Sequence, residues 1–251
     1  MPEAWELTSS DDRIENTIAT FIIFCEDEND EPFYFRSFET KNIKINCISN
    51  QKKSKLNLLN TLTYCMSKDL VECVGHNLKL RDGITENIWC VYDRDFETVD
   101  LEKVKDVDNL NFTTSINTAN HSGLKVAWSN DAFELWVLLH FEKISPSIIL
   151  HRNYIYSRLS DILKENVEIK RDFDRLIKNE TFNYKLHLKK RFAFLKYVLP
   201  LLKTKTDEAI QNAEVLEQHF QGNTPFHQCN PCTKVHHLVN DILSASLEKV
   251  A

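Results

Sequence analysis

The first half of the chain alternates short apolar runs with longer segments of helical periodicity. Four of the runs are rich in β-branched or aromatic residues and are bounded by polar residues, which is typical of buried strands. These runs are Ala19–Cys25, Ile43–Ile48, Ile88–Tyr92 and Leu124–Trp128. Because helical patterns separate the runs, we predict an α/β fold with a mostly parallel sheet flanked by helices.

Two helices are predicted between or after these strands. Apolar residues recur at helical spacing from Leu56 to Cys73, with Ser54 as a candidate N-cap and Gly75 as the stop signal. The run at 132–141 is apolar nearly all round, which predicts a helix buried on every side.

After Pro146 the strand signal vanishes and only helical patterns remain. Pro200 is expected to kink or end one helix, and Thr206 to cap the next. The predicted helices cover Ile155–Leu163, Phe192–Leu202, Thr206–Phe220 and Lys234–Leu247. The shift in composition predicts an α/β core over residues 1–145 and a helical C-terminal region over 146–251 that packs on it.

Composition excludes two common nucleotide-binding sites. The chain of 251 residues has only four glycines, and they are isolated from one another. Neither G-x-G-x-x-G nor G-x-x-x-x-G-K-[ST] can be assembled from them, so a Rossmann cofactor site and a Walker-A loop are excluded.

The cellular compartment of the protein is predicted from its N-terminal residues, its apolar stretches and its cysteines. Residues 1–13 are acidic and polar, unlike a signal peptide, and no stretch reaches the roughly 18 apolar residues that span a bilayer. The seven cysteines are odd in number and lie mostly in apolar runs, which favours reduced thiols. We expect a cytoplasmic protein without a membrane partner.

The net charge of −6 conceals an uneven distribution. Residues 1–150 hold 15 Lys and Arg against 25 Asp and Glu, whereas residues 151–205 hold 14 against 6. An acidic half beside a basic segment suits a metal site next to a surface for a polyanion. Solvated helix faces of unequal charge explain the same numbers equally well.

Three acidic clusters follow predicted strands, where ligands bind in parallel sheets. Glu26 ends the first strand, Asp93 and Asp95 follow the third, and Asp131 follows the fourth, with Glu134 one helical turn further. Carboxylate oxygens suit a hard cation such as Mg²⁺. Solvated loops and helix caps are the plainer reading of each cluster. Together, however, the clusters are expected to repel one another unless a cation binds.

Several segments resemble the RloB family. They are FCEDENDEPFYF (24–35), CVYDRDF (90–96), KVAWSNDAFELWVLLHFE (125–142), AIQNAEVL (209–216) and NPCTKVHHLV (230–239). The family's first motif usually reads EG-x-x-TE-x-x-YF, and here Asp27 and Asp30 replace its glycine and threonine. The resemblance implies a Toprim-like fold and an abortive-infection protein encoded beside an ATPase, which we expect as a partner protein.

The wider Toprim group implies metal-assisted phosphodiester chemistry. By this resemblance Glu26, Asp93 and Asp95 bind Mg²⁺ or Mn²⁺, and Glu134 completes a second metal site or orients its neighbours. Topoisomerases of that group need a tyrosine nucleophile and DNA-gate domains for which this chain is too short, so hydrolysis is favoured.

A basic segment supplies candidate nucleic-acid contacts. Lys185, Lys189, Lys190 and Arg191 are dense enough to contact phosphates, while nearby aromatic side chains could stack on bases. Phe192 is predicted to belong to the core, since it begins the apolar stripe of its helix.

Two other features have plain structural readings. His140 follows apolar residues and is expected to be a hydrogen-bonded core residue rather than a functional one. Cys229 and Cys232 lie near three histidines, but no second ligand pair stands at zinc-finger spacing, so zinc is the weaker reading.

The sequence therefore favours a Mg²⁺-dependent endonuclease that cleaves DNA or RNA, including tRNA, in anti-phage defence. A non-catalytic Toprim-like partner of an ATPase is the first alternative. A phosphatase of the haloacid-dehalogenase type is the second, because it also places D-x-D after an apolar strand. Against it, that strand is normally the first, and Glu97 stands where Thr or Ser is expected.

Overall fold

The computed structural model describes residues 18–49, 58–75, 77–84, 87–96, 98, 100, 103–220, 222 and 224–248. The chain forms two compact units. Unit 1 comprises residues 1–92, 107–128 and 237–251, and unit 2 comprises residues 93–106 and 129–236. The chain thus crosses between units four times, at the carboxyl ends of two strands and near the starts of two helices.

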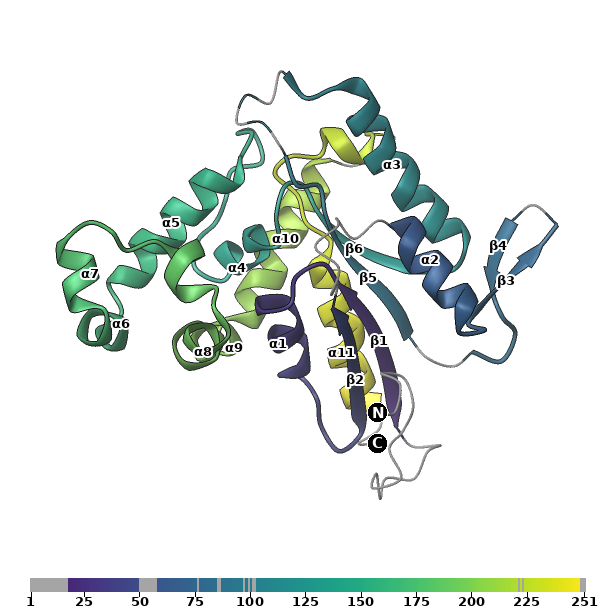
Figure 1. The fold of residues 1–251 in the computed structure, drawn as a ribbon, viewed down its shortest axis with the longest axis horizontal. Coiled ribbons are helices and arrows are strands. Elements are labelled where there is room, and N and C mark those ends of the chain that lie inside the picture. The colour runs from purple at the N-terminus through teal and green to yellow at the C-terminus, as the bar shows by residue number, and fades with distance from the viewer. Residues whose placement is uncertain are drawn as a thin grey trace. The chain divides into compact units, whose positions relative to one another are not determined.

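A four-stranded parallel sheet is the centre of unit 1 (Figure 1). Its order is β2-β1-β5-β6, so the first strand of the chain lies inside the sheet and pairs in parallel with both neighbours. The strands are β1 (Ala19–Cys25), β2 (Ile43–Ser49), β5 (Asn87–Asp93) and β6 (Lys125–Ser129). All four predicted strands are confirmed to within one residue at each end.

The continuous apolar run of β1 explains its inner position. Phe21, Ile22 and Ile23 are consecutive and have no exposed surface, so both faces of the strand are covered. A strand covered on both faces needs no polar alternation, and this is why the run reads as uniformly apolar. The α/β class predicted from the sequence is confirmed, with helices flanking the sheet.

Three helices alternate with the strands before β6. They are α1 (Asp30–Arg36), α2 (Leu58–Ser67) and α3 (Asp106–His121). In Figure 1, α1 lies beside β2, and the Cys47 carbonyl of that strand accepts a hydrogen bond from Arg36. The last helix of the chain is α11 (Val235–Glu248), close to the predicted Lys234–Leu247.

The helix predicted to continue to Cys73 ends earlier, at Ser67. Asp69 adopts a left-handed backbone with φ 59°, and the Leu70 N–H closes the turn on the Cys65 carbonyl. The chain then forms an antiparallel hairpin of β3 (Val71–Val74) and β4 (Asn77–Leu80).

Gly75 belongs to the turn of this hairpin rather than to a helix end. Its φ of 66° is a conformation that glycine adopts without steric cost. The β-branched valines at both ends of β3 favour a strand, a preference that the helical spacing concealed. The predicted N-cap Ser54 lies outside the described residues.

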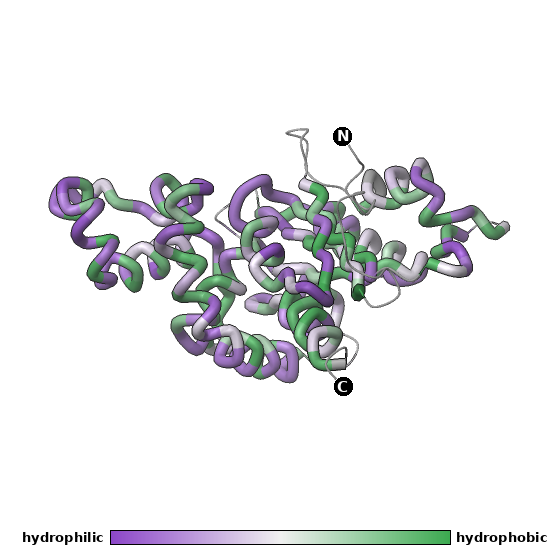
Figure 2. The backbone as a smooth tube through the Cα atoms, turned by 90° about the horizontal axis from the view of Figure 1, so that it is seen from below, coloured by the Kyte–Doolittle hydropathy of each residue, from purple (hydrophilic) through white to green (hydrophobic). Residues whose placement is uncertain are grey.

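Unit 2 consists of helices joined by loops, and no strand follows β6 in the described part of the chain. Its main helices are α4 (Glu134–Leu139), α5 (Arg152–Lys164), α6 (Val167–Asp172), α7 (Asp174–Lys178) and α10 (Thr206–His219). Hydrophilic and hydrophobic residues alternate along the helical segments, as Figure 2 shows. The predicted helical character of the C-terminal part is confirmed, whereas the domain boundary near residue 146 stays a prediction.

The segment predicted as one helix over 192–202 has a different register. It comprises α8 (Arg191–Ala193), a π-helix η4 (Phe194–Val198) and α9 (Leu199–Lys203). The wider π-turn rotates the following residues relative to an α-helix. Phe192 precedes this turn, so it does not share a face with the buried residues that follow the turn. It was predicted to be in the core but is 73% exposed, and Phe194 is buried instead.

Two helix-end predictions in the same region are wrong in detail. Pro200 lies in the first turn of α9, where a missing N–H costs nothing, so it begins this helix rather than ending one. Thr206 is the first residue of α10 rather than its cap, and its hydroxyl donates to the Leu202 carbonyl.

The cysteines behave as core thiols. Six of the seven are buried, Cys73 is exposed, and all seven are free. Burial raises the pKa of Cys65, Cys90 and Cys232 to about 12, so these thiols stay protonated. Among the residues that the structure describes, no helix is both long and apolar enough to cross a membrane.

Candidate functional site

The loop after β5 is held by hydrogen bonds to the loop after β6. Asp93 accepts the Phe133 N–H through Oδ2 at 2.7 Å. The Asp95 N–H donates to the Asp131 carbonyl at 2.9 Å, and the Phe96 N–H donates to Asp131 Oδ1 at 3.0 Å. Both loops belong to unit 2, so the D-x-D motif and the third predicted acidic cluster are parts of one polar structure.

Two aspartates in these loops adopt a left-handed backbone. Asp95 has φ 57° and Asp131 has φ 102°. Aspartate is among the few residues besides glycine that visit this region, because its short side chain bonds locally. The residue type therefore fits the turn that both loops require.

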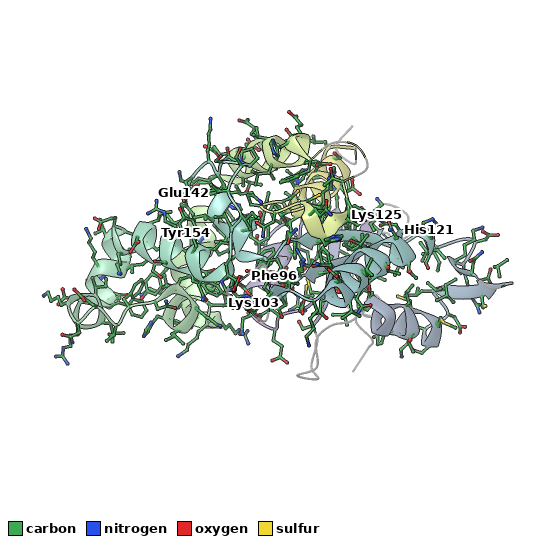
Figure 3. The ribbon with its side chains drawn as sticks, turned by 90° about the horizontal axis from the view of Figure 1, so that it is seen from above. Phe96, Lys103, His121, Lys125, Glu142 and Tyr154 are labelled. Atoms are coloured by element: carbon green, nitrogen blue, oxygen red, sulfur yellow. The ribbon has the colours of Figure 1, made fainter. Side chains whose placement is uncertain are left out.

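Arg152 joins the two aspartates. Its guanidinium pairs with Asp95 Oδ1 and, at 2.8 Å, with Asp131 Oδ1, while Nη2 also donates to the Phe96 carbonyl at 2.9 Å. The labelled Phe96 marks the position of the loop after β5 in Figure 3. The Arg152 N–H, at the start of α5, donates to Asp131 Oδ2. Arg152 therefore fixes the loop after β5 through its side chain, and the loop after β6 through both its side chain and its backbone.

Burial and charge have opposite effects on the pKa values of Asp131 and Arg152. Asp131 has no exposed surface, and desolvation raises its pKa although the positive charge of Arg152 opposes the shift. Desolvation lowers the pKa of Arg152, but the charges of Asp131 and Asp95 outweigh it and raise the pKa overall. Arg152 thus remains charged.

The loop after β6 is also hydrogen-bonded to residues 229–233, about 100 residues further along the chain. The Ser129 hydroxyl bonds the Thr233 hydroxyl at 3.0 Å, and the Asn130 N–H donates to the Cys232 carbonyl at 2.9 Å. The Asn130 side chain donates to the Cys229 carbonyl at 2.7 Å and accepts from Arg94. Two of the segments that carry the family resemblance, at 125–142 and 230–239, are therefore hydrogen-bonded to each other in unit 2.

Glu134 is buried and forms a second ion pair. It is 1% exposed, and its Oε1 lies 2.6 Å from Lys189 Nζ. Its Oε2 accepts from the Tyr156 hydroxyl at 3.5 Å. Both carboxylate oxygens thus face donors from other helical segments of unit 2.

The pKa of Tyr156 is affected by the charged groups around this ion pair. Burial raises its pKa, and the charge of Glu134 raises it further, while Lys189 and Arg152 lower it and Asp93 raises it. All four charged groups therefore lie within electrostatic reach of one phenol. We refer to the six charged side chains of this region as the inner cluster: Asp93, Asp95, Asp131, Glu134, Arg152 and Lys189.

The cations of the inner cluster change the electrostatic argument made from the sequence. The acidic clusters were expected to repel one another unless a metal ion binds. Arg152 and Lys189 instead supply positive charge from within the chain. Sequence reasoning missed Arg152 altogether, since an arginine at the start of an amphipathic helix gives no sign of a partner 57 residues away.

Glu26 belongs to unit 1 and follows β1. Its N–H donates to Glu31 Oε2 at 2.8 Å, and the Asp27 N–H donates to the same oxygen at 3.3 Å. Glu31 is 1% exposed, so it shapes the backbone of this loop. The strands β1 and β5 are parallel neighbours with Phe24 opposite Cys90. That Glu26 joins Asp93 and Asp95 around one metal stays a prediction.

The other predicted nucleic-acid contacts differ from Lys189. Lys185, Lys190 and Arg191 are exposed, and we call them the outer cations. The Lys185 ammonium lies 5.4 Å from the centre of the Tyr156 ring. Lys189, in contrast, pairs with the buried carboxylate of Glu134.

The donor set fits a hard cation in part. Asp93 and Asp95 are half-buried carboxylates, and oxygen ligands are those that Mg²⁺ and Mn²⁺ prefer. The pair with Arg152 uses one of the two Asp95 oxygens. Glu134 fits less well, because its carboxylate already holds Lys189 and Tyr156.

His140 is the hydrogen-bonded core residue that the sequence predicts. His140 is 2% exposed, its Nδ1 contacts the Trp136 carbonyl at 2.9 Å, and burial lowers its pKa to about 4. Cys229 and Cys232 are buried, and desolvation raises the pKa of both thiols. That they bind no zinc stays a prediction.

Comparison with known proteins adds one finding. Searches of curated proteins and of solved structures give no match. A family model described as RloB-like protein matches residues 21–242, which is most of the chain. The matched range includes both loops of the inner cluster and residues 229–233, and the chain belongs to the RloB-like protein family.

Proposed function

We propose that this protein is a metal-dependent nuclease that hydrolyses phosphodiester bonds in DNA or RNA, including tRNA. The observation that carries the proposal is the inner cluster. It combines half-buried carboxylates at the end of β5 with two cations fixed by buried acids. Phosphodiester hydrolysis needs both, since a carboxylate-bound metal and fixed cations stabilise charge that develops on the phosphate.

In this proposal Asp93 and Asp95 hold Mg²⁺ or Mn²⁺, and Glu26 is the third ligand. When bound, the ion supplies Lewis-acid polarisation of the phosphate. Asp93 is oriented by the Phe133 N–H, and Asp95 by Arg152. These contacts limit the rotamers of both carboxylates, so their oxygens are preorganised for a ligand.

The outer cations are proposed to attract and hold the nucleic-acid backbone. They lie in the basic segment 151–205, while residues 1–150 carry an excess of acidic residues. Exposed lysine and arginine side chains contact phosphates without reading sequence, so this surface suits either DNA or RNA.

The proposed context is anti-phage defence with an ATPase partner in the cytoplasm. Support for it comes from the family, whose members include abortive-infection proteins encoded beside an ATPase. The chain has no Walker-A loop of its own, because its four glycines are isolated. We therefore expect the chain to be nearly inactive alone and to associate with an ATPase.

One observation favours the non-catalytic alternative. Asp95, Asp131 and Glu134 are each paired with a cation of the chain, so much of the acidic charge is balanced without a metal. In that case the protein acts only as a partner of an ATPase. The phosphatase alternative gains nothing, since β5 is not the first strand, and Glu97 lies outside the described residues.

Coexpression with the neighbouring ATPase, followed by sequencing of the cellular DNA and RNA, tests the proposal. The wild-type chain should produce new ends that are absent from cells expressing the Asp93→Asn variant. Asparagine keeps an oxygen that can accept the Phe133 N–H, so this variant should fold. Identical ends from both proteins, or no ends from either, would exclude the nuclease.

A further inference from the structure

Lys189 and the outer cations differ in how they are held. The Lys189 ammonium lies 2.6 Å from Glu134 Oε1, and its side chain is 22% exposed. Lys185, Lys190 and Arg191 are exposed. A cation anchored on a buried acid has a fixed position, whereas an exposed lysine samples many rotamers.

The backbone at Lys189 is fixed as well. Lys189 follows the π-helix η3 (Tyr184–Leu188), and its N–H donates to the Tyr184 carbonyl at 3.0 Å. Tyr184 and Leu188 are fully buried, and the Tyr184 N–H donates to the Ser160 hydroxyl at 2.8 Å. Short π-helical turns are frequent at functional sites, where they re-aim a side chain.

Glu134 acts as the anchor of this lysine. It lies on the short buried helix α4, and its second oxygen faces the Tyr156 hydroxyl. A buried carboxylate needs a cation to compensate the cost of desolvation, and Lys189 provides it.

The surroundings indicate what this cation can bind. The Phe133 N–H donates to Asp93 Oδ2 at 2.7 Å, and the next residue, Glu134, holds the Lys189 ammonium at 2.6 Å. Two adjacent residues thus place the lysine in the neighbourhood of the first aspartate of D-x-D. A partly exposed ammonium in that neighbourhood suits an oxyanion next to a carboxylate-bound metal.

We propose that Lys189 binds the scissile phosphate and that Glu134, rather than ligating a metal, is the positioning residue for Lys189. The inference rests on the proposed nuclease function and deepens it. It divides the four predicted basic residues into two kinds: Lys189 acts on the rate of cleavage, and the outer cations act on affinity.

The test measures binding and single-turnover cleavage separately, using the full chain copurified with its ATPase. Affinity for a labelled single-stranded oligonucleotide is measured with Ca²⁺ in place of Mg²⁺, and cleavage is then started with Mg²⁺. Lys189→Met should slow cleavage about 100-fold, as loss of one transition-state donor does, with affinity changed less than about twofold. Lys189→Arg should recover part of the rate, because it restores the charge.

Two further variants separate chemistry from folding. Lys189→Met leaves Glu134 buried without its cation, so it risks unfolding. The double variant Glu134→Gln with Lys189→Met removes both charges, and it should be folded by circular dichroism yet as slow as Lys189→Met. Glu134→Gln alone keeps the lysine charge and should lose only about tenfold in rate. The matched control is Lys79→Met, a lysine paired with Asp82 on the exposed β3–β4 hairpin.

The outcomes distinguish the inference from the proposed function. Cleavage by the wild type together with a normal rate in the double variant would overturn the role of Lys189 and leave the nuclease intact. A loss of affinity equal to the loss of rate would place Lys189 with the outer cations and also overturn it. No cleavage by the wild-type complex would remove the nuclease and the inference together.

Discussion

The inner cluster and the outer cations use the same residue types in opposite ways. Each inner charge has a partner of opposite sign or a backbone donor at a set distance, and Asp131 and Glu134 are fully buried. The side chains of the outer cations are exposed to solvent. Fixed charges can orient a reacting group, whereas mobile exposed charges mainly attract a ligand. This comparison favours a role in phosphodiester hydrolysis for the inner cluster and a role in nucleic-acid binding for the outer cations.

The largest expected effect is on stability. Arg152→Met removes the cation that compensates Asp131, which has no exposed surface. Breaking such a buried pair should lower the free energy of unfolding by about 3–5 kcal/mol, measured by urea denaturation at pH 7.

The control for this variant is Arg158→Met. Arg158 pairs with Glu142 at 2.6 Å in a more exposed setting, so its loss should cost about 0–1 kcal/mol. Equal losses in the two variants would show that Arg152 is an ordinary surface partner and that the inner cluster has no special rigidity.

A second, smaller effect is a pH dependence of stability caused by His140, the C-cap residue of α4. Burial lowers the pKa of His140 from 6.5 to about 4. Between these values the unfolded chain binds a proton that the folded chain excludes. Stability should therefore fall as the pH drops from 6.5 to 4, by about 3 kcal/mol from this residue.

Urea denaturation of the wild type and of His140→Asn across this pH range measures the effect. Asparagine retains a donor for the Trp136 carbonyl, so the variant should fold at pH 7 and lose part of the acid sensitivity. Parallel pH profiles for the two proteins would show that His140 titrates normally and that α4 is less tightly packed than its burial indicates.

The smallest expected effect concerns the outer cations. Replacing Lys185, Lys190 and Arg191 together by uncharged residues should weaken nucleic-acid binding and flatten its salt dependence. Each lost phosphate contact lowers the slope of log K against log salt by about 0.7–0.9. Fluorescence anisotropy at several salt concentrations gives the slope. An unchanged slope would assign this surface to a protein partner or to solvent.

The features that the sequence predicted correctly are those that depend on residues close together in the chain. The features that it missed depend on residues far apart in the chain or on local changes of helix geometry. The four strands of the sheet were predicted because each is a local apolar run. The β3–β4 hairpin was missed because leucines at helical spacing precede it, and the exposure of Phe192 was missed because a π-turn shifts the helix register.

The candidate site shows the same limit. Asp93, Asp95 and Glu134 were found from their places after strands, which a local pattern reveals. Arg152, the partner of Asp95, lies 57 residues further along the chain, and no local pattern marks it. Lys189 was predicted as a phosphate contact from its basic segment, but its pairing with Glu134, 55 residues away, was not. Charge pairing across a fold is a tertiary property, so it needed the structure.

The most direct test of the central claim is the cleavage rate of the Asp93→Asn variant in Mg²⁺, measured on the full chain copurified with its ATPase. If Asp93 and Asp95 hold the metal ion for hydrolysis, the wild type should cleave, EDTA should abolish cleavage, and Asp93→Asn should be about 1,000-fold slower while keeping its fold. Wild-type rates in the variant, or cleavage that continues in EDTA, would contradict the account.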